Sequence, residues 1–408
     1  MMICRKTYRK FLLGLLAVSL LGLGVYDYFR ERARIPDSYV QTEGEPGPAE
    51  PDFPVTAQIT QSVTEASYNS RIGKSYQISY RYLRWMPLKE TEVTVVQKTC
   101  VIPGGIPVGI YMETDGVLVI GTGKVTGRDG LTYEPAFRLV QAGDYIRSVN
   151  GQAIREKEEL IEAVQEQGSE KVVLGLERDG RSFEIRLSAT DTEEGFRLGI
   201  WVRDNTQGIG TLTFLTEDGS FGALGHGIND SDTGKLLKLS EGKLYDTSVA
   251  EIHRGEPGTP GEVAGLIRYR ESLICGEIQE NTEAGIFGTA TEHLREQLPV
   301  ETLEVGYKQE ITRGEAWIRS AVSGEVRDYR IEIEEIHSSE SDVNKGIVLR
   351  VTDPELLALA GGIVQGMSGS PVIQNGKIVG AVTHVFINDP TKGYGIFIEN
   401  MLDPQEKS

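Results

Sequence analysis

Residues that bind metals or form cross-links are scarce in this chain. Its 408 residues include three cysteines and five histidines. Cys4 precedes a long apolar run, and Cys100 and Cys275 fall in different expected domains, so no disulfide is expected. The sequence contains neither a Cys-x-x-Cys nor a His-x-x-x-His spacing. We therefore expect no metal site and no cofactor.

Positive charge is also in short supply. Lys and Arg number 42 against 60 Asp and Glu, which gives a formal net charge of −18. Residues 1–35 run against this trend with seven basic and two acidic side chains, so the rest of the chain is strongly acidic. A body of that charge is repelled by nucleic acid, and we exclude this class of partner.

Long helical patterns are few, whereas turn-forming residues are plentiful. The 48 glycines and 16 prolines favour many turns. We therefore expect a mainly β fold with a few helices. A length of 408 residues exceeds what one hydrophobic core supports, so two or three domains are expected.

The one long apolar run lies at residues 11–25 and follows four basic residues. No small-residue cleavage site comes after it; the chain continues Tyr-Asp-Tyr-Phe-Arg. Residues 1–35 are therefore predicted to be a signal anchor that spans a membrane, rather than a signal peptide that is removed. In either case the body is exported.

Two segments precede the first recognisable domain. Residues 36–56 are rich in Pro and Glu and are expected to form an extended, disordered spacer. Residues 57–100 contain short alternating runs and are expected to form a β segment.

A short helix, Gly-Asp, a strand and Asn-Gly follow one another in residues 135–151, PAFRLVQAGDYIRSVNG. This pattern resembles the core signature of PDZ domains. A helix over 157–167 and two strands joined by an Asp-Gly turn complete the unit. We assign residues 101–190 to it.

The PDZ resemblance implies that a peptide adds as an extra strand beside one helix. By that resemblance, Val108, Gly109 and Ile110 would form the carboxylate-binding loop and strand. Leu160 and Val164 on the helix would form the facing wall, and plain core packing is an equally good interpretation of both.

Ser368 lies in the string GMSGSPVI at residues 366–373. A serine hydroxyl attacks a carbonyl only if a base takes its proton and backbone N–H groups receive the oxyanion. Flanking glycines permit a tight turn, and Asn-Gly at 375–376 predicts a following hairpin. The string resembles the nucleophile turn of trypsin-like serine proteases, Gly-Asp-Ser-Gly-Gly-Pro. By motif geometry, the N–H groups of Gly366 and Ser368 would be the oxyanion donors; the other interpretation is a Gly/Ser-rich loop between two strands.

His226 is the expected general base, because a histidine between two glycines at the end of an apolar segment suits a turn at a cleft. His384 competes with it from an apolar strand, where a histidine is more often a satisfied core residue. The remaining histidines lie in polar surroundings: His253, His293 and His337.

A carboxylate would fix the tautomer of the base. Asp353 closes an apolar strand just before a proline, and an equally good interpretation is that it caps the helix that follows. Asp230, Asp232 and Asp246 compete for the role.

The signal anchor, the PDZ signature, Gly-His-Gly and Gly-Ile-Val-Gln-Gly-Met-Ser-Gly-Ser-Pro together resemble the stage IV sporulation protein B peptidases of endospore-forming bacteria. The resemblance implies a trypsin-like β-barrel serine endopeptidase over residues 191–408, with Ser368 as nucleophile, His226 as base and Asp353 as acid. One departure is visible: Asp353 precedes Ser368 by only 15 residues, whereas the acid of the ordinary two-barrel arrangement lies much farther upstream. Either the barrel is rewired or Asp353 has another role.

The resemblance also implies a place and a task. The enzyme would be exported from the forespore into the space between forespore and mother-cell membranes. There it would cleave itself and then a membrane-bound inhibitory subunit of an intramembrane protease complex, which releases sigma-K processing. The alternatives are a catalytically inactive PDZ scaffold that binds peptides and an HtrA-like envelope quality-control protease. The order of domains disfavours the latter, because HtrA-like proteases usually carry the PDZ domain after the protease.

Overall fold

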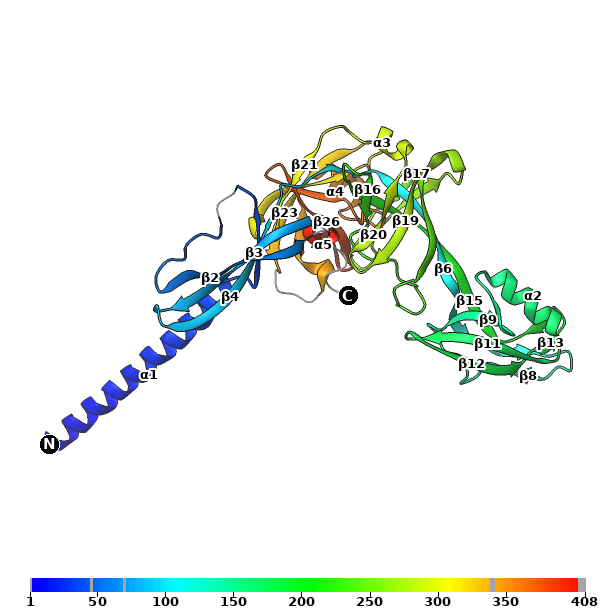
Figure 1. The fold of residues 1–408 in the computed structure, drawn as a ribbon, viewed down its shortest axis with the longest axis horizontal. Helices are drawn as coiled ribbons and strands as arrows, with labels where there is room; N and C mark the ends of the chain where they lie inside the picture. The colour runs from blue at the N-terminus through cyan, green and yellow to red at the C-terminus, as the bar shows by residue number, and fades with distance from the viewer. Residues whose placement is uncertain (1, 45–46, 69–70, 338–341, 403–408) are drawn as a thin grey trace. The chain divides into compact units, whose positions relative to one another are not determined.

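The computed structural model describes residues 2–44, 47–68, 71–337 and 342–402, and the chain divides into two compact units, Met1–Thr99 and Cys100–Ser408. Both units are dominated by strands (Figure 1). The predicted mainly β fold with a few helices is confirmed.

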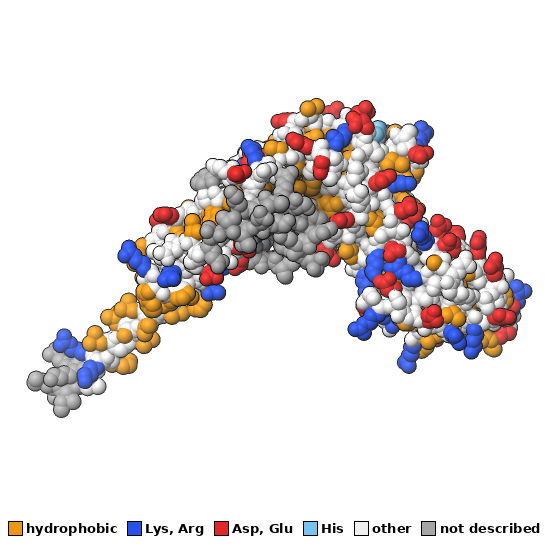
Figure 2. Space-filling model, viewed as in Figure 1, with side chains coloured by type: hydrophobic (Ala, Val, Ile, Leu, Met, Phe, Trp, Pro, Cys, Tyr) orange, Lys and Arg blue, Asp and Glu red, His pale blue; other side chains and the backbone are white. Residues whose placement is uncertain are grey.

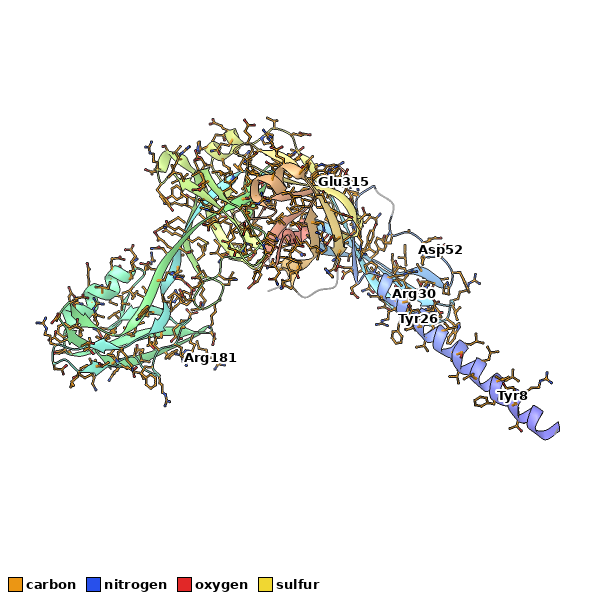
Figure 3. The ribbon with its side chains drawn as sticks, turned by 180° about the vertical axis from the view of Figure 1, so that it is seen from behind. Tyr8, Tyr26, Arg30, Asp52, Arg181 and Glu315 are labelled. Carbon is orange, nitrogen blue, oxygen red and sulfur yellow. The ribbon has the colours of Figure 1, made fainter. Side chains whose placement is uncertain are left out.

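The first unit begins with the long helix α1 (Met2–Arg34). Within it, Thr7–Arg34 is long and apolar enough to cross a membrane, and an 18-residue window inside this stretch has a mean hydropathy of 1.8. Its apolar side chains are exposed, as Figure 2 shows, and Figure 3 marks Tyr8 and Tyr26 along it. The helix therefore fits the predicted signal anchor.

A four-stranded sheet in the order β1-β4-β3-β2 follows the helix. Its strands are β1 (Ser38–Thr42), β2 (Val55–Tyr68), β3 (Arg71–Tyr82) and β4 (Met86–Val96). Ile35, Val55, Tyr80 and Val93 are among the buried residues of its core. Strands β3 and β4 and most of β2 lie within 57–100, where a β segment was expected, and β1 lies before it.

The structure differs from the predicted disordered spacer over 36–56. Ser38–Thr42 pairs in parallel with β4, and Val40 is buried. The Thr91 hydroxyl donates to the carbonyl of Pro36 at 2.6 Å. Pro and Glu content misled the prediction, because the short alternating run at 38–42 adds a strand to an existing sheet edge. Residues 45–46 of this stretch lie outside the described residues.

Among its described residues, the second unit has three large hydrophobic cores. The first belongs to the PDZ domain and includes Val117, Val149, Leu160, Val164 and Leu187. Its elements are β7 (Val125–Thr126), β8 (Thr132–Tyr133), β9 (Tyr145–Val149), β10 (Gln152–Ala153), α2 (Lys157–Gln167), β11 (Lys171–Arg178), β12 (Arg181–Ser188), β13 (Thr190–Thr192) and β14 (Gly195–Arg197).

The other two cores fill the protease body. One includes Met112, Leu212, Phe221 and Leu244. It is built from β5 (Cys100–Pro103), β6 (Pro107–Thr122), β15 (Ile200–Leu215), β16 (Ser220–Ala223), β17 (Leu239–His253), β18 (Glu262–Ile267), β19 (Ile274–Thr282), β20 (Gly285–Ala290) and α3 (Glu292–Gln297).

The last core includes Ile318, Leu349, Leu356 and Val382. The elements of this part of the chain are β21 (Leu303–Val305), β22 (Gly314–Ser320), β23 (Arg327–Ile336), β24 (Ile347–Val351), α4 (Pro354–Ala360), β25 (Pro371–Gln374), β26 (Lys377–Phe386), β27 (Asp389–Phe397) and α5 (Ile398–Leu402). Short 3₁₀ turns lie at Glu271–Leu273, Lys308–Glu310 and Val343–Lys345.

Strands β6 and β15 pair antiparallel from the barrel into the PDZ domain. Pro107 lies opposite Thr211 at one end of the ladder and Thr122 opposite Ile200 at the other. The PDZ core is thus inserted between β6 and β15. Residues 101–114, which we expected to belong to the PDZ domain, pair instead with barrel strands β15, β17 and β21. A strand that serves two cores keeps one alternating pattern, so the sequence gives no boundary within it.

Candidate active site and peptide groove

Ser368 lies on a sharp turn that leads into β25. Gly366 and Gly369 on either side have φ of +97° and +96°, a region that suits glycine. A Cβ on Gly369 would lie 2.1 Å from the carbonyl oxygen of Thr211. The turn is also fixed by hydrogen bonds, because the Thr211 N–H donates to the Ser368 carbonyl at 2.9 Å and its hydroxyl to the Gly366 carbonyl at 2.7 Å.

The predicted hairpin after this turn is confirmed. Strands β25 and β26 pair antiparallel, with Gln374 opposite Lys377. Asn375 and Gly376 between them have φ of 53° and 75°. The N–H of Gly369 donates to the carbonyl of Val382 at 2.7 Å, which ties the serine turn to β26.

Two backbone N–H groups at the turn are available to a ligand. The N–H groups of Met367, Gly369 and Ser370 each donate to a backbone carbonyl. Within the described parts of the chain, no acceptor pairs with the N–H of Gly366 or of Ser368. These are the two groups that the sequence predicts as oxyanion donors.

His226 is brought to the same region through Thr211. The Thr211 carbonyl accepts a hydrogen bond from the N–H of Leu224 at 3.2 Å, while the Thr211 N–H holds Ser368. Leu224 and Gly225 have φ of 72° and 71°, so the chain turns sharply just before the histidine. The fold therefore places the turn that carries Ser368 and the chain just before His226 against the same residue of β15.

Strand β26 supplies a second link between these two side chains. The Ser368 hydroxyl donates to the carbonyl of Thr383 at 2.8 Å. The next residue is His384, whose ring lies 4.9 Å, centroid to centroid, from the ring of His226. Among the described residues no hydrogen bond joins Ser368 to His226; such catalytic bonds often form only in the substrate complex.

The histidine environment favours the neutral imidazole. Burial lowers the pKa of His226 below its usual 6.5, and the contact with the Gly227 carbonyl opposes this only in part. Nδ1 of His226 lies 2.9 Å from that carbonyl oxygen. Since a carbonyl oxygen only accepts, Nδ1 carries the hydrogen and Nε2 keeps a lone pair that can take a proton.

Burial also lowers the pKa of His384, to about 4, with a further contribution from His226 beside it. The Asp342 carboxylate acts in the opposite direction on the His384 pKa. Part of the His384 residue stays exposed to solvent. Sequence reasoning ranked His384 as a core residue and did not single out Asp342, which follows a polar stretch without a recognisable pattern.

Asp353 caps helix α4. Its carboxylate accepts hydrogen bonds from the N–H groups of Glu355 at 2.9 Å, Leu356 at 3.2 Å and Arg330 at 3.2 Å. In the described ranges it has no hydrogen bond or ion pair with His226. The capping role that the sequence left open is therefore the one that these contacts support.

The competing carboxylates are also engaged elsewhere. Asp230 and Asp232 both pair with Arg203. Asp246 pairs with Arg268 at 3.3 Å and lies 3.5 Å from His293. Across the described residues, none of the three contacts His226.

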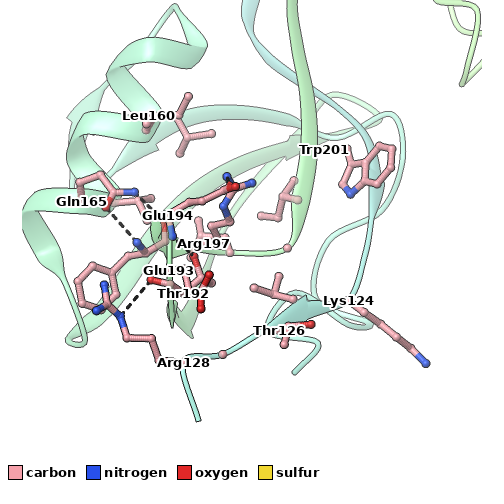
Figure 4. Close-up of a pocket in the computed structure, with 18 of the residues that line it drawn as sticks. Lys124, Thr126, Arg128, Leu160, Gln165, Thr192, Glu193, Glu194, Arg197 and Trp201 are labelled. Atoms are coloured by element: carbon pink, nitrogen blue, oxygen red, sulfur yellow. Dashed lines mark hydrogen bonds and ion pairs between the residues drawn. The ribbon is translucent and has the colours of Figure 1, made fainter. Parts of the chain in front are cut away.

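The PDZ domain carries a groove of about 980 Å³ (Figure 4). One wall is helix α2 with Leu160, Ile161, Val164 and Gln165, and the other is the segment 192–202. The predicted pair Leu160 and Val164 thus lines the groove and also belongs to the core, with exposed fractions of 5% and 4%.

Val108, Gly109 and Ile110 do not belong to this groove. They lie in the barrel half of β6, between β15 and β17. The side chains of Val108 and Ile110 are buried there. This part of the prediction is wrong, because these residues belong to the barrel and not to the PDZ core. The segment 196–202, FRLGIWV, takes their place; its glycine between two apolar residues was the signal that could have identified it.

A second cavity, of about 490 Å³, lies next to Gly366. Strand β18 forms one side, and Gln207, Ile209 and Gln365 contribute to the rest. Its position beside one of the two available N–H groups makes it a candidate site for substrate residues near the bond to be cut.

Two family models match the chain. The SpoIVB peptidase S55 model matches residues 194–402, and a PDZ domain model matches residues 135–178. No curated protein matches it significantly.

Solved structures resemble parts of the chain. The PDZ domain of an SdrC-like protein from Listeria monocytogenes is 22% identical, covers 22% of this chain and 87% of its own, with a TM-score of 0.18. The HtrA-type protease AlgW with a decapeptide is 10% identical, with a TM-score of 0.24. That match covers 56% of this chain and 54% of the AlgW chain, so this chain spans about half the length of the HtrA-type protease.

The family match at 194–402 includes just over half of the 408 residues. It contains the serine turn, the Gly-His-Gly loop and both of their hydrogen-bonded neighbours on β15 and β26. The chain belongs to the SpoIVB peptidase S55 family and is a PDZ-containing serine peptidase.

Proposed function

We propose that Ser368 is the nucleophile and His226 the general base of a membrane-anchored endopeptidase. The main support for the proposal is that Thr211 hydrogen-bonds to both loops. Its N–H donates to the Ser368 carbonyl, and its carbonyl accepts from the N–H of Leu224, just before His226. For attack, the Ser368 hydroxyl would have to turn from the Thr383 carbonyl, its acceptor in this structure, to Nε2 of His226.

The reaction then follows from the residue chemistry. Ser368 Oγ attacks the carbonyl carbon of the scissile peptide while His226 Nε2 takes the hydroxyl proton. The oxyanion receives hydrogen bonds from the N–H groups of Gly366 and Ser368. His226 gives its proton to the leaving amine, which departs and leaves an acyl-enzyme. Water, deprotonated by the same imidazole, releases the acid product and restores the serine.

That Asp353 is the third member of a catalytic triad stays a prediction. The family resemblance supports it, whereas the three backbone N–H bonds of its carboxylate support a helix cap. In this proposal the Gly227 carbonyl holds Nδ1–H and fixes the tautomer of His226. Asp353 would assist only if α4 or the His226 loop moved.

The PDZ groove is proposed to bind peptide segments. A peptide would lie along 196–202 and face α2, in the manner of strand addition. Apolar residues such as Leu160 and Val164 would receive an apolar side chain of the peptide.

The task in the cell is proposed from family membership. The peptidase would act in the space between forespore and mother-cell membranes, cleave itself, and then cleave a membrane-bound inhibitory subunit of an intramembrane protease complex. That cleavage would release sigma-K processing. The exported, membrane-anchored topology expected from α1 supports this location.

The experiment that tests the function compares the full chain with its Ser368→Ala variant. Each is incubated in lipid nanodiscs, alone and with the inhibitory subunit. We expect self-cleavage and subunit cleavage with the parent chain and neither with the variant. Cleavage by both would refute the role of Ser368. A parent chain that binds the subunit without cutting it would instead favour the inactive peptide-binding scaffold. Unfolded casein is added in a separate incubation, and its general degradation would favour the HtrA-like alternative.

A further inference from the structure

The end of helix α1 is fixed to the tip of the β3–β4 hairpin. The Tyr82 hydroxyl donates to the Asp27 carboxylate at 2.9 Å, and the Tyr28 hydroxyl donates to the Pro87 carbonyl at 2.9 Å. The rings of Tyr28 and Tyr82 pack edge to face with centroids 5.7 Å apart. Arg32 adds a hydrogen bond to the Leu88 carbonyl at 2.9 Å. These contacts therefore fix the position of the hairpin tip along the axis of helix α1.

That position coincides with the edge of the expected membrane span. The apolar run ends at Val25, and a helix rises about 1.5 Å per residue, so Asp27 and Tyr28 lie about 3–5 Å beyond it. The 15 apolar residues of 11–25 would cover about 22 Å, less than the ~30 Å of a bilayer's hydrocarbon core. A short span draws its flanking residues toward the lipid, or thins the bilayer around them.

The side chains exposed at this level are those that favour a membrane interface. Leu83, Arg84 and Trp85 form the three-residue turn of the hairpin. Leu83 and Arg84 have φ of 51° and 71°, and Trp85 has 69% of its surface exposed. The Leu83 N–H donates to the Pro54 carbonyl at 2.7 Å, which places exposed Phe53 beside the tip. Figure 2 shows hydrophobic side chains gathered where the helix meets the sheet. Tryptophan and tyrosine are enriched at this depth in membrane proteins.

The charges near the tip fit a phospholipid surface. In the parts of the chain that the structure describes, Arg81 and Arg84 pair with no carboxylate. Arg30, labelled in Figure 3, is held by Asp27 at 3.0 Å and Glu31 at 2.8 Å. Asp52, labelled in the same figure, is the acidic side chain next to Phe53. Long basic side chains reach lipid phosphates while their stems stay in apolar surroundings.

We propose that the tip of the β3–β4 hairpin is a second membrane contact, with Leu83 and Trp85 inserted into the interfacial layer of the bilayer that α1 crosses and Arg84 on a lipid phosphate. This inference rests on α1 as the membrane anchor and is independent of the catalytic assignment. It fixes the sheet of the first unit against the membrane surface instead of leaving it on a spacer.

The test uses tryptophan quenching by brominated lipid. The full chain, with Ser368→Ala so that it stays intact, is reconstituted into vesicles of phosphatidylcholine and phosphatidylglycerol, with or without acyl chains brominated near the headgroup. Trp85 is one of three tryptophans, with Trp201 and Trp317. Flotation of the vesicles first establishes that the chain is anchored.

We expect brominated lipid to quench both the parent chain and the Trp201→Phe control. The Trp85→Phe variant should show a fractional loss at least about twofold smaller, because the interfacial tryptophan is gone. Equal quenching with and without Trp85 would overturn the proposal. Emission of Trp85 that depends on protein concentration in unbrominated vesicles would also overturn it, since a second copy of the chain would then cover the tip. A chain that fails to float would remove the anchor and the proposal together.

Discussion

The imidazole rings of His226 and His384 lie 4.9 Å apart, centroid to centroid, with their planes inclined by 34°. Two imidazolium ions at this distance repel each other, so protonation of one ring disfavours protonation of the other. Burial acts in the same direction and lowers the pKa of both rings. The pair is therefore poised to be neutral, which is the form that a general base needs before attack.

This relationship predicts the pH dependence of peptidase activity. Because the pKa of His226 is lowered, the neutral base persists below pH 6.5, and kcat/KM falls only on further acidification. The measurement is kcat/KM for a peptide substrate from about pH 4 to 8. The His384→Phe variant keeps a ring against His226 and should keep this acid limb. An acid limb above 6.5 in the parent chain would contradict the neutral-pair interpretation.

Asp353 gives a prediction that separates a helix cap from a catalytic carboxylate. Asn and Ser cap helices about as well as Asp, whereas Ala costs about 1 kcal/mol. We expect Asp353→Asn and Asp353→Ser to keep the cap bonds to Glu355 and Leu356 and to lose only the bond from the Arg330 N–H, so each should cost less unfolding free energy than Asp353→Ala. Loss of the cap in Asp353→Ala should itself cost about 1 kcal/mol, measured by urea unfolding.

The activity of the same variants completes this comparison. If only the cap matters, Asp353→Asn should keep kcat within about tenfold. A loss of about 10⁴-fold in a folded Asp353→Asn enzyme would assign the carboxylate to the triad, as in the serine proteases in which this change was made. Asp353→Ser, which caps but carries no amide, serves as the matched control.

Gly369 is predicted to tolerate no side chain. Its φ is +96°, and a Cβ would meet the Thr211 carbonyl at 2.1 Å, in the contact that supports the serine turn. Gly376 in the next turn has a φ of +75° with open space around it, so it isolates the cost of backbone strain. We expect Gly376→Ala to cost about 1 kcal/mol and Gly369→Ala to cost more and to abolish cleavage. Equal stability and activity in the two variants would contradict the assigned geometry.

The PDZ groove predicts different outcomes for neighbouring residues of α2. Leu160 is buried in the domain core, so Leu160→Ala should cost about 2–5 kcal/mol of stability along with any peptide binding. Ile161 lines the same groove with 52% of its surface exposed. Ile161→Ser should weaken the binding of a labelled peptide with an apolar C-terminus, measured by fluorescence anisotropy, while stability stays unchanged. Unaltered binding in Ile161→Ser would place the peptide elsewhere.

Local motifs predicted much of this architecture, because their conformations are set by a few neighbouring residues. The Asn-Gly turn after Ser368 and the PDZ core at 135–178 are of this kind. The insertion of the PDZ core between β6 and β15 was not predictable, since it depends on strand pairs such as Pro107 with Thr211, far apart in the sequence. For the same reason Val108 was assigned to the wrong groove.

The features of the candidate site also differ in whether local sequence or tertiary structure determines them. Glycines around Ser368 and His226 marked both turns, because such backbone conformations restrict the residue type. Tertiary structure brings together the rings of His226 and His384 and sets the hydrogen bonds of Thr211 to both loops. Neither contact leaves a pattern in the sequence. Asp353 could be read as a cap or as an acid from its position before Pro354, and only contacts distinguish the two.

If His226 makes the Ser368 hydroxyl reactive, labelling by a fluorophosphonate probe depends on both residues. The full chain is labelled beside Ser368→Ala, His226→Ala and, as a surface control, His337→Ala. We expect rapid labelling of the parent and the His337 variant, none of the Ser368 variant, and a rate lower by about 10³-fold or more for the His226 variant. A folded His226→Ala chain that labels at the parent rate would contradict this role of His226.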